Sequence, residues 1–317
     1  MNDNTYVAAA ERYANLQTMY NRCGNSGILL PKISLGFWHN FGADAPFERS
    51  RAITRFAFDH GITHFDFANN YGVPYGSAEL TFGRLMAEDF APYRDELFIS
   101  TKAGYDMWPG LYGEWGSRKY LMASLDQSLK RMRLDYVDLF YSHRFDPNTP
   151  IEETLQALVD IVRQGKALYV GISNWPLEPL RKAVIYLRER DVPLLIYQGR
   201  LNMLDREPLE DGILDFCRES GVGFIAYSPL AQGLLTDRYI AGIPADSRMA
   251  KEHFLKSSRR TPELLDYLRQ LQSQAQAANR TIAQEALSWV LAQSGVTSVL
   301  VGASSVQQLA DNLRVSI

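Results

Sequence analysis

The chain has 317 residues, of which 46% are hydrophobic, and its formal net charge is −3. This composition provides enough apolar side chains for a large buried core, so a mainly disordered chain is excluded. The small negative charge excludes a global basic surface for nucleic acid or an anionic membrane, and no apolar run approaches the roughly 20 residues of a membrane-spanning helix.

The N-terminal sequence predicts an extension over residues 1–17 rather than a secretory signal, because it lacks a basic stretch followed by an apolar one. The two cysteines, Cys23 and Cys217, are too few for a disulfide framework. Neither has a CxxC partner or a histidine cluster nearby. We therefore expect two free thiols, no metal site and a cytoplasmic protein.

A hairpin and eight strands are predicted in chain order. Residues 18–32 are typical of a small hairpin that turns at Gly24-Asn25, placed so that it closes the bottom of a barrel. Eight runs rich in aliphatic and aromatic residues follow, without regular alternation with polar residues, as in the buried strands of a parallel sheet. They lie at 33–38, 63–68, 97–103, 136–143, 167–174, 194–199, 223–230 and 296–303.

Helical patterns with apolar residues at three- and four-residue spacing separate these runs. Gly61, Gly165, Gly221 and Gly295 each end such a pattern just before a strand, where a left-handed residue is favoured. The alternation predicts an α/β fold, a (β/α)8 TIM barrel. The connection at 231–295 is long enough for a loop and two extra helices, near 262–278 and 283–293.

Two other architectures were weighed against a single barrel over 1–317. Length alone would fit two domains, and the alternation also fits an open doubly wound sheet. Residues 221–226 match the string GxGxxA of dinucleotide-binding folds, but here the string follows a helix and opens a strand. We interpret it as a helix-ending glycine and a strand start, and the chain has no P-loop motif.

Polar residues gather where the predicted strands end, which is where barrel enzymes place their active sites. Asp66 and Tyr71 follow the second strand, Lys102 ends the third, and His143 ends the fourth. Ionisable groups in such apolar strands are costly unless they pair, so we expect Asp66 to pair with Lys102. A purely structural ion pair, with packing roles for the tyrosine and histidine, is the alternative.

These four side chains also form a chemically sensible group. The ammonium of Lys102 would stabilise a tyrosinate and bring the pKa of Tyr71 down towards neutral pH. Asp66 would keep the lysine charged and oriented. A neutral His143 would polarise a substrate carbonyl by a hydrogen bond, without a metal. The sequence thus predicts acid–base chemistry on a carbonyl group.

The chain resembles the aldo-keto reductase superfamily. The strings that carry the resemblance run in the family's order and cover almost the whole chain: DFANNYG, ISTKAGY, DLFYSHR, GISNW, AYSPLAQGLLT and VLVGASSVQQLADN. Within the family, GFWHNFG, STKAGYDMWPGLYG and PLAQGLLTDRYIAGIPADSRM look most like the bacterial L-glyceraldehyde 3-phosphate reductase branch, which is related to potassium-channel β subunits.

The resemblance implies a catalytic tetrad of Asp66, Tyr71, Lys102 and His143, with NADPH as cofactor. Hydride would pass from the nicotinamide to a carbonyl carbon, and Tyr71 would protonate the oxygen. The cofactor-binding residues that it implies, besides Asp66, are Trp38, Ser173, Asn174, Gln198, Tyr227, Ser228, Pro229, Leu230, Gln232, Gly233, Leu235, Arg238, Arg248, Gly302, Ser304, Gln308, Asp311 and Asn312.

Two parts of that set have independent physical reasons. Ser304 is predicted as the N-cap of the last helix, and a helix N-terminus near arginines suits a phosphate. Arg238 and Arg248 favour NADPH over NADH, because a 2′-phosphate needs cationic partners; alternatively they are solvated surface charges.

The substrate site is predicted from fewer signals. Trp38, Trp108, Tyr71 and His143 would surround the substrate, and Tyr105 and His39 lie near the same mouth. Packing is the alternative for the tryptophans. Arg144 would attract a substrate phosphate or pair with Asp146.

The expected activity is the reduction of small carbonyl compounds such as glyceraldehyde 3-phosphate or methylglyoxal. The alternative is an NADPH-binding regulatory subunit like the channel β subunits, although these generally lack a histidine at the position of His143. A barrel aldolase or isomerase that uses Lys102 as a Schiff-base amine is a third reading. The resemblance also implies a homo-oligomer, a tetramer or larger, and a family C-terminal segment that is trimmed or absent after Ile317.

Overall fold

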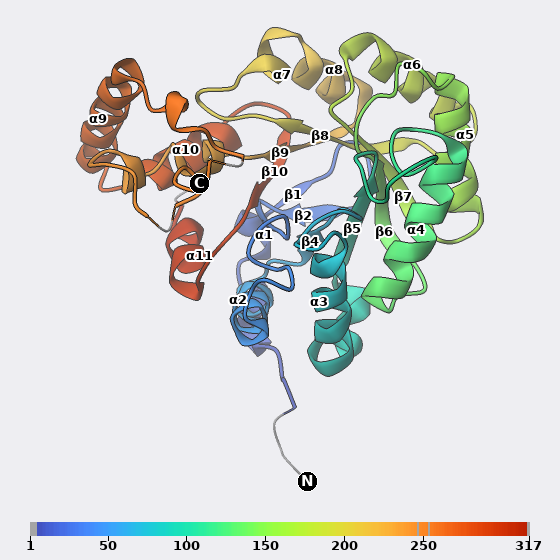
Figure 1. Ribbon diagram of the computed structural model, residues 1–317, viewed down its shortest axis with the longest axis horizontal. Helices are drawn as coiled ribbons and strands as arrows, with labels where there is room; N and C mark the ends of the chain where they lie inside the picture. Colours follow the sequence, from blue (N-terminus) through green and yellow to red (C-terminus); the bar gives the residue numbers. More distant parts are fainter. Residues whose placement is uncertain (1–4, 246, 253, 316–317) are drawn as a thin grey trace.

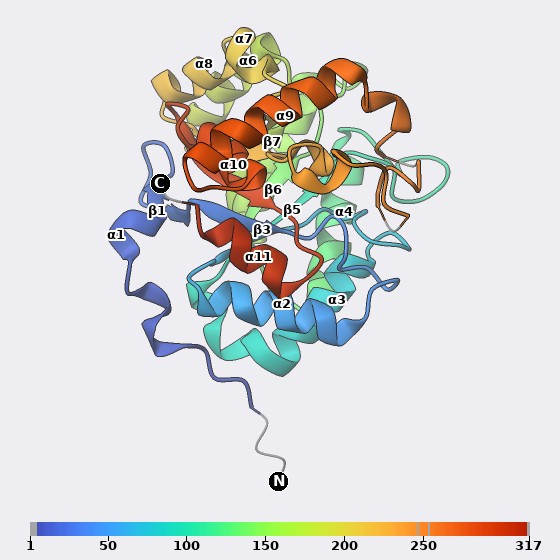
Figure 2. The same cartoon turned by 90° about the vertical axis from the view of Figure 1, so that its left-hand side faces the viewer.

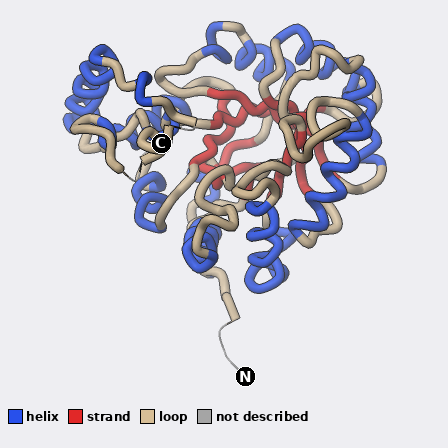
Figure 3. The backbone as a smooth tube through the Cα atoms, in the orientation of Figure 1, coloured by secondary structure: helices blue, strands red, loops and turns tan. Residues whose placement is uncertain are grey.

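The computed structural model describes residues 5–245, 247–252 and 254–315. Eight parallel strands close into a barrel in the order β10-β3-β4-β5-β6-β7-β8-β9, and the helices surround it (Figures 1 and 3). The predicted (β/α)8 fold is therefore confirmed, and the doubly wound alternative is wrong because β10 pairs with both β9 and β3.

The barrel strands are β3 (Ile33–Gly36), β4 (His64–Asp66), β5 (Phe98–Ala103), β6 (Val137–Ser142), β7 (Ala167–Ser173), β8 (Leu194–Arg200), β9 (Gly223–Tyr227) and β10 (Val296–Val301). The α-helices are α1 (Leu16–Met19), α2 (Phe47–Asp59), α3 (Ser77–Leu85), α4 (Arg118–Met132), α5 (Ile151–Arg163), α6 (Leu177–Arg188), α7 (Glu207–Glu210), α8 (Ile213–Ser220), α9 (Pro262–Ala277), α10 (Ile282–Leu291) and α11 (Val306–Leu313). Each predicted run coincides with one barrel strand to within a few residues.

The strands differ from the prediction mainly at their C-terminal ends. The run at 223–230 was expected to continue past Tyr227, but β9 ends there. The next residue, Ser228, has φ of 52°, and this left-handed conformation breaks an extended strand. The chain leaves the barrel at this point, at the same end where β4, β5 and β6 also finish.

Three helices end at or just before the glycines predicted for them, Gly61, Gly165 and Gly221, whereas α10 ends at Leu291, before Gly295. Gly61, Gly165, Gly221 and Gly295 have φ of 80°, 70°, 73° and 100°, which non-glycine residues adopt only at a cost. Each glycine therefore turns the chain back towards the next strand. This repeated turn explains how short connections hold the helices against the outside of the barrel.

A two-stranded hairpin of β1 (Tyr20–Arg22) and β2 (Leu29–Pro31) covers the bottom of the barrel, as predicted. Cys23 is fully buried there and packs among residues at the N-terminal ends of the strands. Gly24 has φ of 52°, and a Cβ at this position would lie 2.1 Å from the Gly221 carbonyl oxygen. The hairpin can reach this position only because residue 24 has no side chain.

The N-terminal segment follows the outside of the barrel to α2. The Tyr6 hydroxyl and the Ala9 amide both donate to Asp59, each over 2.8 Å. Arg12 and Tyr13 both donate to Glu96, over 2.7 Å and 2.6 Å. The part of the N-terminal extension that the structure describes is thus attached by charged hydrogen bonds.

The described residues of 231–295 form a compact addition beside the barrel mouth, whose helices α9 and α10 face the viewer in Figure 2. The two predicted extra helices are α9 and α10. This addition has a small hydrophobic core of its own, formed by Ala231, Leu234, Leu235, Tyr239, Met249, Leu255, Leu268, Leu271, Ile282 and Ala286. It folds against itself as well as against the barrel.

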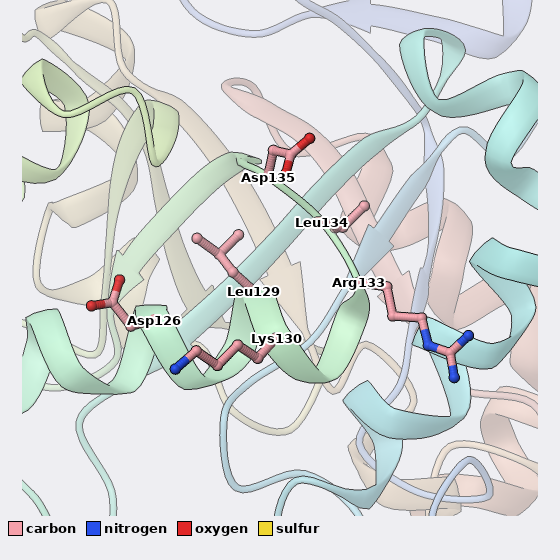
Figure 4. Close-up of a pocket in the computed structure, with 6 residues that line it drawn as sticks. All are labelled: Asp126, Leu129, Lys130, Arg133, Leu134 and Asp135. Carbon is pink, nitrogen blue, oxygen red and sulfur yellow. The ribbon is translucent and has the colours of Figure 1, made fainter.

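Two cavities lie at the end of the barrel opposite to its mouth. A cavity of about 440 Å³ is lined by Asp126, Leu129, Lys130, Arg133, Leu134 and Asp135 (Figure 4), between the end of α4 and the start of β6. A second one of about 210 Å³ lies beside Asn25 in the hairpin. Both lie near the N-terminal ends of the strands, so chemistry rather than cavity size identifies the candidate site.

The described residues can be searched for free thiols, for clusters that would hold a metal ion and for membrane-spanning helices. Cys23 and Cys217 are both buried free thiols, as expected. Among the described residues, no three histidine, cysteine, aspartate or glutamate side chains come together in a way that would hold a metal ion. Over the same part of the chain, every helix is too short or too polar to cross a membrane.

Candidate active site

A buried ion pair lies at the C-terminal ends of β4 and β5. Lys102 is fully buried, and its ammonium donates to the carboxylate of Asp66 and, over 2.8 Å, to the carbonyl of Phe67. The two strands are neighbours in the sheet. Because an unpaired charge inside a barrel would be strongly destabilising, the predicted pairing is what allows Lys102 to be there.

The carboxylate of Asp66 accepts two further hydrogen bonds. Ser100 donates over 2.7 Å from β5, and Gln198 donates over 3.1 Å from β8. A carboxylate with three donors is well satisfied in a buried site. Asp66 is therefore the centre of the cluster, and it connects three strands.

Tyr71 and His143 complete the group that the sequence predicts. The Lys102 Nζ lies 5.2 Å from the centre of the Tyr71 ring. The rings of Tyr71 and His143 are 6.0 Å apart, and the ring of Tyr105 packs edge-on against His143 at 4.7 Å. The fold thus brings all four predicted catalytic side chains into one cluster, although they come from three strand ends.

The pKa of Tyr71 is raised well above its usual value, opposite to the direction expected from the sequence. Burial is the largest cause, and the negative charge of Asp66 acts in the same sense. The expectation counted the ammonium of Lys102 but not the carboxylate that holds it. Tyr71 therefore keeps its proton at neutral pH, which suits a proton donor.

His143 is held in its neutral form. Its pKa lies well below the usual value because it is buried and because Lys102 and Arg144 repel a further positive charge. Its Nδ1 atom is buried without a hydrogen-bond partner among the described residues. Burial also lowers the pKa of Lys102, against the opposing effect of Asp66. The neutral imidazole agrees with the role predicted for it.

A second group of predicted residues lies beside this cluster. Asn174, with φ of 56°, donates to the Ser173 hydroxyl and to the His143 carbonyl, both over 3.1 Å. The Tyr227 hydroxyl donates to Asn174 Oδ1 over 2.7 Å. With Gln198 on Asp66, these side chains place amide and hydroxyl groups next to the ion pair.

The loop after β9 turns tightly over residues 228–235. Ser228, Ala231, Gln232 and Gly233 all have positive φ, and the loop holds itself by hydrogen bonds such as Gly233 N to Leu230 O, 2.8 Å. Pro229 lies within this turn and is buried. Leu235, in contrast, is fully buried in the small core of the addition, so only its backbone can face a ligand.

Two predicted arginines lie near each other in the addition. Arg248 is half-buried, and its pKa is lowered by burial and by the positive charge of Arg238. Arg238 itself is exposed, so the partly buried environment belongs to Arg248 alone. A solvated surface charge, the alternative for Arg248, does not describe this environment.

The residues predicted from the last strand and helix lie around α11. The prediction that Ser304 is the N-cap of this helix is wrong. The N-cap is Ser305, whose side chain accepts a hydrogen bond from the Gln308 amide. Ser304 instead donates from its amide to Gln308 Oε1 over 2.8 Å. Asn312 is buried, and its Nδ2 donor has no partner among the described residues.

Two further predicted residues complete this end. Gly302 directly follows β10, and a Cβ there would meet only the Gly36 carbonyl oxygen, at 3.9 Å. Asp311 accepts from Gln307 over 2.9 Å and lies 3.7 Å from Arg314. Its side chain is therefore engaged along its own helix.

The predicted substrate residues divide into two places. Trp38 lies 6.5 Å from the Tyr71 ring and packs edge-on against Phe254 at 4.9 Å, so it borders the cluster. Trp108 packs against the buried Tyr120 of α4 at 5.3 Å. The packing alternative thus describes Trp108, while Trp38 stands beside the catalytic group.

One alternative from the sequence paired Arg144 with Asp146, but the structure pairs it with another carboxylate. Arg144 forms an ion pair with Glu114 over 2.8 Å and donates to the Gly104 carbonyl, also over 2.8 Å. Its guanidinium lies 3.5 Å above the Trp115 ring. The carboxylate of Asp146 instead accepts hydrogen bonds within its own turn, from Asn148 and Thr149, and from the Gly116 amide.

Comparison with known proteins identifies the family. The model of the Aldo/keto reductase family matches residues 32–317, nine-tenths of the chain. The chain belongs to this family. The resemblance and the fold predicted from the sequence are both confirmed, and the protein is an oxidoreductase of the aldo-keto reductase type.

Several aldo-keto reductase relatives cover nearly the whole chain. It is 58% identical over 313 residues to the L-glyceraldehyde 3-phosphate reductase of Escherichia coli K12, which covers 98% of this chain and 90% of that protein. It is 34% identical over 301 residues to a probable voltage-gated potassium channel subunit beta of Arabidopsis thaliana, covering 93% of this chain and 90% of that protein.

A solved structure also matches this aldo-keto reductase. It is a crystal structure of a thermostable aldo-keto reductase in complex with the inhibitor epalrestat, with a TM-score of 0.71 and 31% identity over 93% of both chains. Both the fold and the family assignment therefore rest on sequence and on structure.

Sequence reasoning missed one part of this aldo-keto reductase site, the serine that donates to Asp66. Ser100 stands two residues before Lys102 on β5, and successive side chains of a strand alternate between its two faces. Residues 100 and 102 therefore point to the same side. A polar residue two positions before a buried lysine was the available signal.

Proposed function

We propose that the protein reduces small aldehydes and ketones to alcohols with NADPH. Enzymes of this family use nicotinamide cofactors, generally NADP(H). The observation that carries the proposal is the buried Asp66–Lys102 pair beside a protonated Tyr71 and a neutral His143. When bound, the cofactor supplies a hydride to the carbonyl carbon, and a proton from the protein completes the alcohol.

The protein's own residues would then act on the carbonyl oxygen. Tyr71, which keeps its proton at neutral pH, gives that proton to the oxygen as charge develops there. The positive charge of Lys102 stabilises the tyrosinate that remains, and Asp66 holds Lys102 in position. The neutral His143 donates a hydrogen bond to the same oxygen and so polarises the carbonyl group.

The chain's own polar groups support a bound dinucleotide. Asn312 Nδ2 and Gln232 Oε1 are buried polar atoms without partners among the described residues, and buried polar atoms normally have one. The turn at 228–233 contains several residues with positive φ, and such a turn would let the backbone approach a bound ligand closely. Ser173, Asn174 and Gln198 would hold the carboxamide of the nicotinamide, and the other predicted cofactor residues, from the loop after β9, the addition and α11, would hold the rest.

For the substrate we propose small carbonyl compounds, glyceraldehyde 3-phosphate and methylglyoxal among them. The name of the Escherichia coli relative supports the first. The test is the rate of NADPH consumption with a panel that pairs glyceraldehyde 3-phosphate with unphosphorylated glyceraldehyde. A phosphate preference requires donors other than Arg144, whose guanidinium is engaged by Glu114 and Gly104. No turnover of any aldehyde would contradict the proposal.

Replacing Arg248 by methionine should weaken NADPH binding about tenfold and leave NADH binding nearly unchanged. The reason is the loss of one charge-assisted contact to the 2′-phosphate, which NADH lacks. Fluorescence titration with both cofactors measures the two dissociation constants. Arg269→Met is the matched control, because Arg269 is exposed on α9 and pairs with Asp266. Equal weakening for both cofactors would contradict the assignment.

The reduction rate should show no titration of Tyr71 or His143 between about pH 6.5 and about pH 10. The raised pKa keeps Tyr71 protonated up to the alkaline limit, and the lowered pKa keeps His143 neutral down to the acid limit. Measurement of kcat at saturating substrate across this range checks the prediction. A loss of activity with a midpoint near pH 8 would show that Tyr71 ionises far more easily than its burial implies.

A regulatory subunit is the second candidate, supported by the 34% identity to the plant channel subunits. Such a protein would bind NADPH tightly and turn over slowly. Single-turnover kinetics combined with affinity capture of partners separates the two functions. Rapid multiple turnover without a stable partner would exclude the regulator. Borohydride trapping without an adduct at Lys102 would exclude the Schiff-base alternative.

Assembly and location remain predictions. We expect a homo-oligomer, a tetramer or larger, in the cytoplasm. Light scattering on the purified full chain would measure the mass of the assembly directly.

A further inference from the structure

A chain of buried hydrogen bonds begins at Asp66 and runs through the barrel interior. Asp66 Oδ1 accepts from the Ser100 hydroxyl over 2.7 Å. The same hydroxyl lies 3.0 Å from Nε2 of His64, and Nδ1 of His64 lies 2.9 Å from the hydroxyl of Ser34. Ser100, His64 and Ser34 are all fully buried. The proposed mechanism uses Asp66 but none of these three residues.

The chain continues to the opposite end of the barrel. The hydroxyl of Ser34 lies 2.7 Å from that of Ser298 on β10. Ser298 in turn donates to the carbonyl of Pro31, over 2.7 Å, at the end of the hairpin strand β2. Side chains from β4, β5, β3 and β10 therefore connect the ion pair at the mouth to the hairpin at the bottom.

A count of hydrogens fixes how this chain is arranged. It has five contacts: Asp66–Ser100, Ser100–His64, His64–Ser34, Ser34–Ser298 and Ser298–Pro31. Both ends only accept, because one is a carboxylate and the other a carbonyl. Three serines and a neutral imidazole supply one hydrogen each, which makes four hydrogens for five contacts. One contact therefore lacks a hydrogen.

The imidazole of His64 is neutral at neutral pH, since burial lowers its pKa to about 4. If the hydrogen is on Nε2, His64 donates to Ser100, and the Ser100 hydroxyl is free to donate to Asp66. The missing hydrogen then falls at the hairpin end, where Ser298 has a choice of two neutral acceptors. If it is on Nδ1, Nε2 becomes an acceptor that competes with Asp66 for the Ser100 hydrogen.

The first arrangement is favoured because hydrogen bonds to a charged group are the stronger ones. A buried carboxylate that loses a donor is destabilised more than a neutral hydroxyl that does. Asp66 then keeps all three donors, from Lys102, Ser100 and Gln198. The location of one hydrogen on His64 thus decides whether Nε2 competes with the carboxylate that holds Lys102 for the Ser100 hydrogen.

We propose that His64 is a positioning residue of the reaction: as its Nε2–H tautomer, it holds the Ser100 hydroxyl on Asp66 and thereby keeps Lys102 in place. The role in catalysis rests on the proposed function, whereas the tautomer does not. His64 acts through Ser100 and touches neither substrate nor cofactor.

The tautomer can be read without substrate by nitrogen NMR of the full chain with 15N-labelled histidine. The sequence has only five histidines, and His64→Gln identifies the signal of His64. We expect a hydrogen on Nε2 in the parent protein. Ser100→Ala should move it to Nδ1, because Nε2 then loses its acceptor while Nδ1 can donate to Ser34. Ser34→Ala is the matched control and should leave it on Nε2.

Asp66→Asn gives a second, independent test. An amide in place of the carboxylate can donate to Ser100, which then donates to Nε2, so the hydrogen should again move to Nδ1 of His64. A parent protein with the hydrogen on Nδ1, or a tautomer that none of these substitutions moves, would overturn the proposal.

Kinetics test the catalytic part. Ser100→Ala should lower kcat about tenfold with little change in KM, since Asp66 loses a charged hydrogen bond. Ser34→Ala should stay within about twofold of the parent, because it breaks the chain beyond His64. Equal losses in both variants would show a structural role only and overturn the proposal. A parent protein without reductase activity would refute the proposed function, and the NMR result would still decide the tautomer.

Discussion

Tyr71→Phe should lower kcat for aldehyde reduction by about 100-fold or more while leaving NADPH binding unchanged. A general acid contributes a factor of about 10² to 10⁴, and phenylalanine removes only the hydroxyl that carries the proton. The ring of Tyr71 would stay beside Lys102 and His143, so the shape of the site is kept. Steady-state rates with saturating NADPH measure the loss.

Tyr75→Phe is the matched control for this experiment. Tyr75 lies four residues later on the same loop, is half exposed and donates to Asp106 over 2.8 Å. It should keep the parent's kcat within about twofold, because an exposed hydrogen bond of this kind contributes little. A Tyr71→Phe protein as fast as the parent would show that another group protonates the carbonyl oxygen.

Lys102→Met should abolish most activity and also lower the free energy of unfolding by about 3 to 5 kcal/mol. The substitution leaves the carboxylate of Asp66 buried without its counter-charge, although Ser100 and Gln198 still donate to it. Breaking one side of a buried ion pair is costly for this reason. Urea unfolding of the parent and the variant measures the stability, and NADPH consumption measures the activity.

Lys166→Met separates this effect from the general loss of a lysine. Lys166 pairs with Asp126 over 2.7 Å at the protein surface, where water screens both charges. We expect a loss below about 1 kcal/mol and unchanged kcat. If Lys102→Met were as stable as the parent, the Asp66–Lys102 pair would not contribute the stability expected of a buried ion pair.

The barrel could be predicted because its signals are local. Each strand is a short apolar run, and each of the four glycines marks a turn of fixed geometry. The position of the site followed from a general rule on barrels, and the ion pair followed from the cost of a buried charge. Asp66 and Lys102 therefore needed no structure to be placed together.

The remaining features depend on residues that are distant in the sequence. Arg144 pairs with Glu114, thirty positions earlier, and nothing local distinguishes this partner from Asp146. The pKa of Tyr71 depends on burial and on Asp66 as well as on Lys102, and the balance appears only in three dimensions. Ser304 and Ser305 are adjacent serines, so only backbone geometry identifies the cap.

Two of the three hydrophobic clusters among the described residues have different evolutionary consequences. The addition at 231–295 has a small core of its own, and Leu287 and Val290 of α10 attach it to the barrel core. If the addition holds the adenosine end of the cofactor, as proposed, mutations there alter cofactor affinity without disturbing the ion pair at Asp66. Selection can then adjust cofactor preference and chemistry separately within one chain.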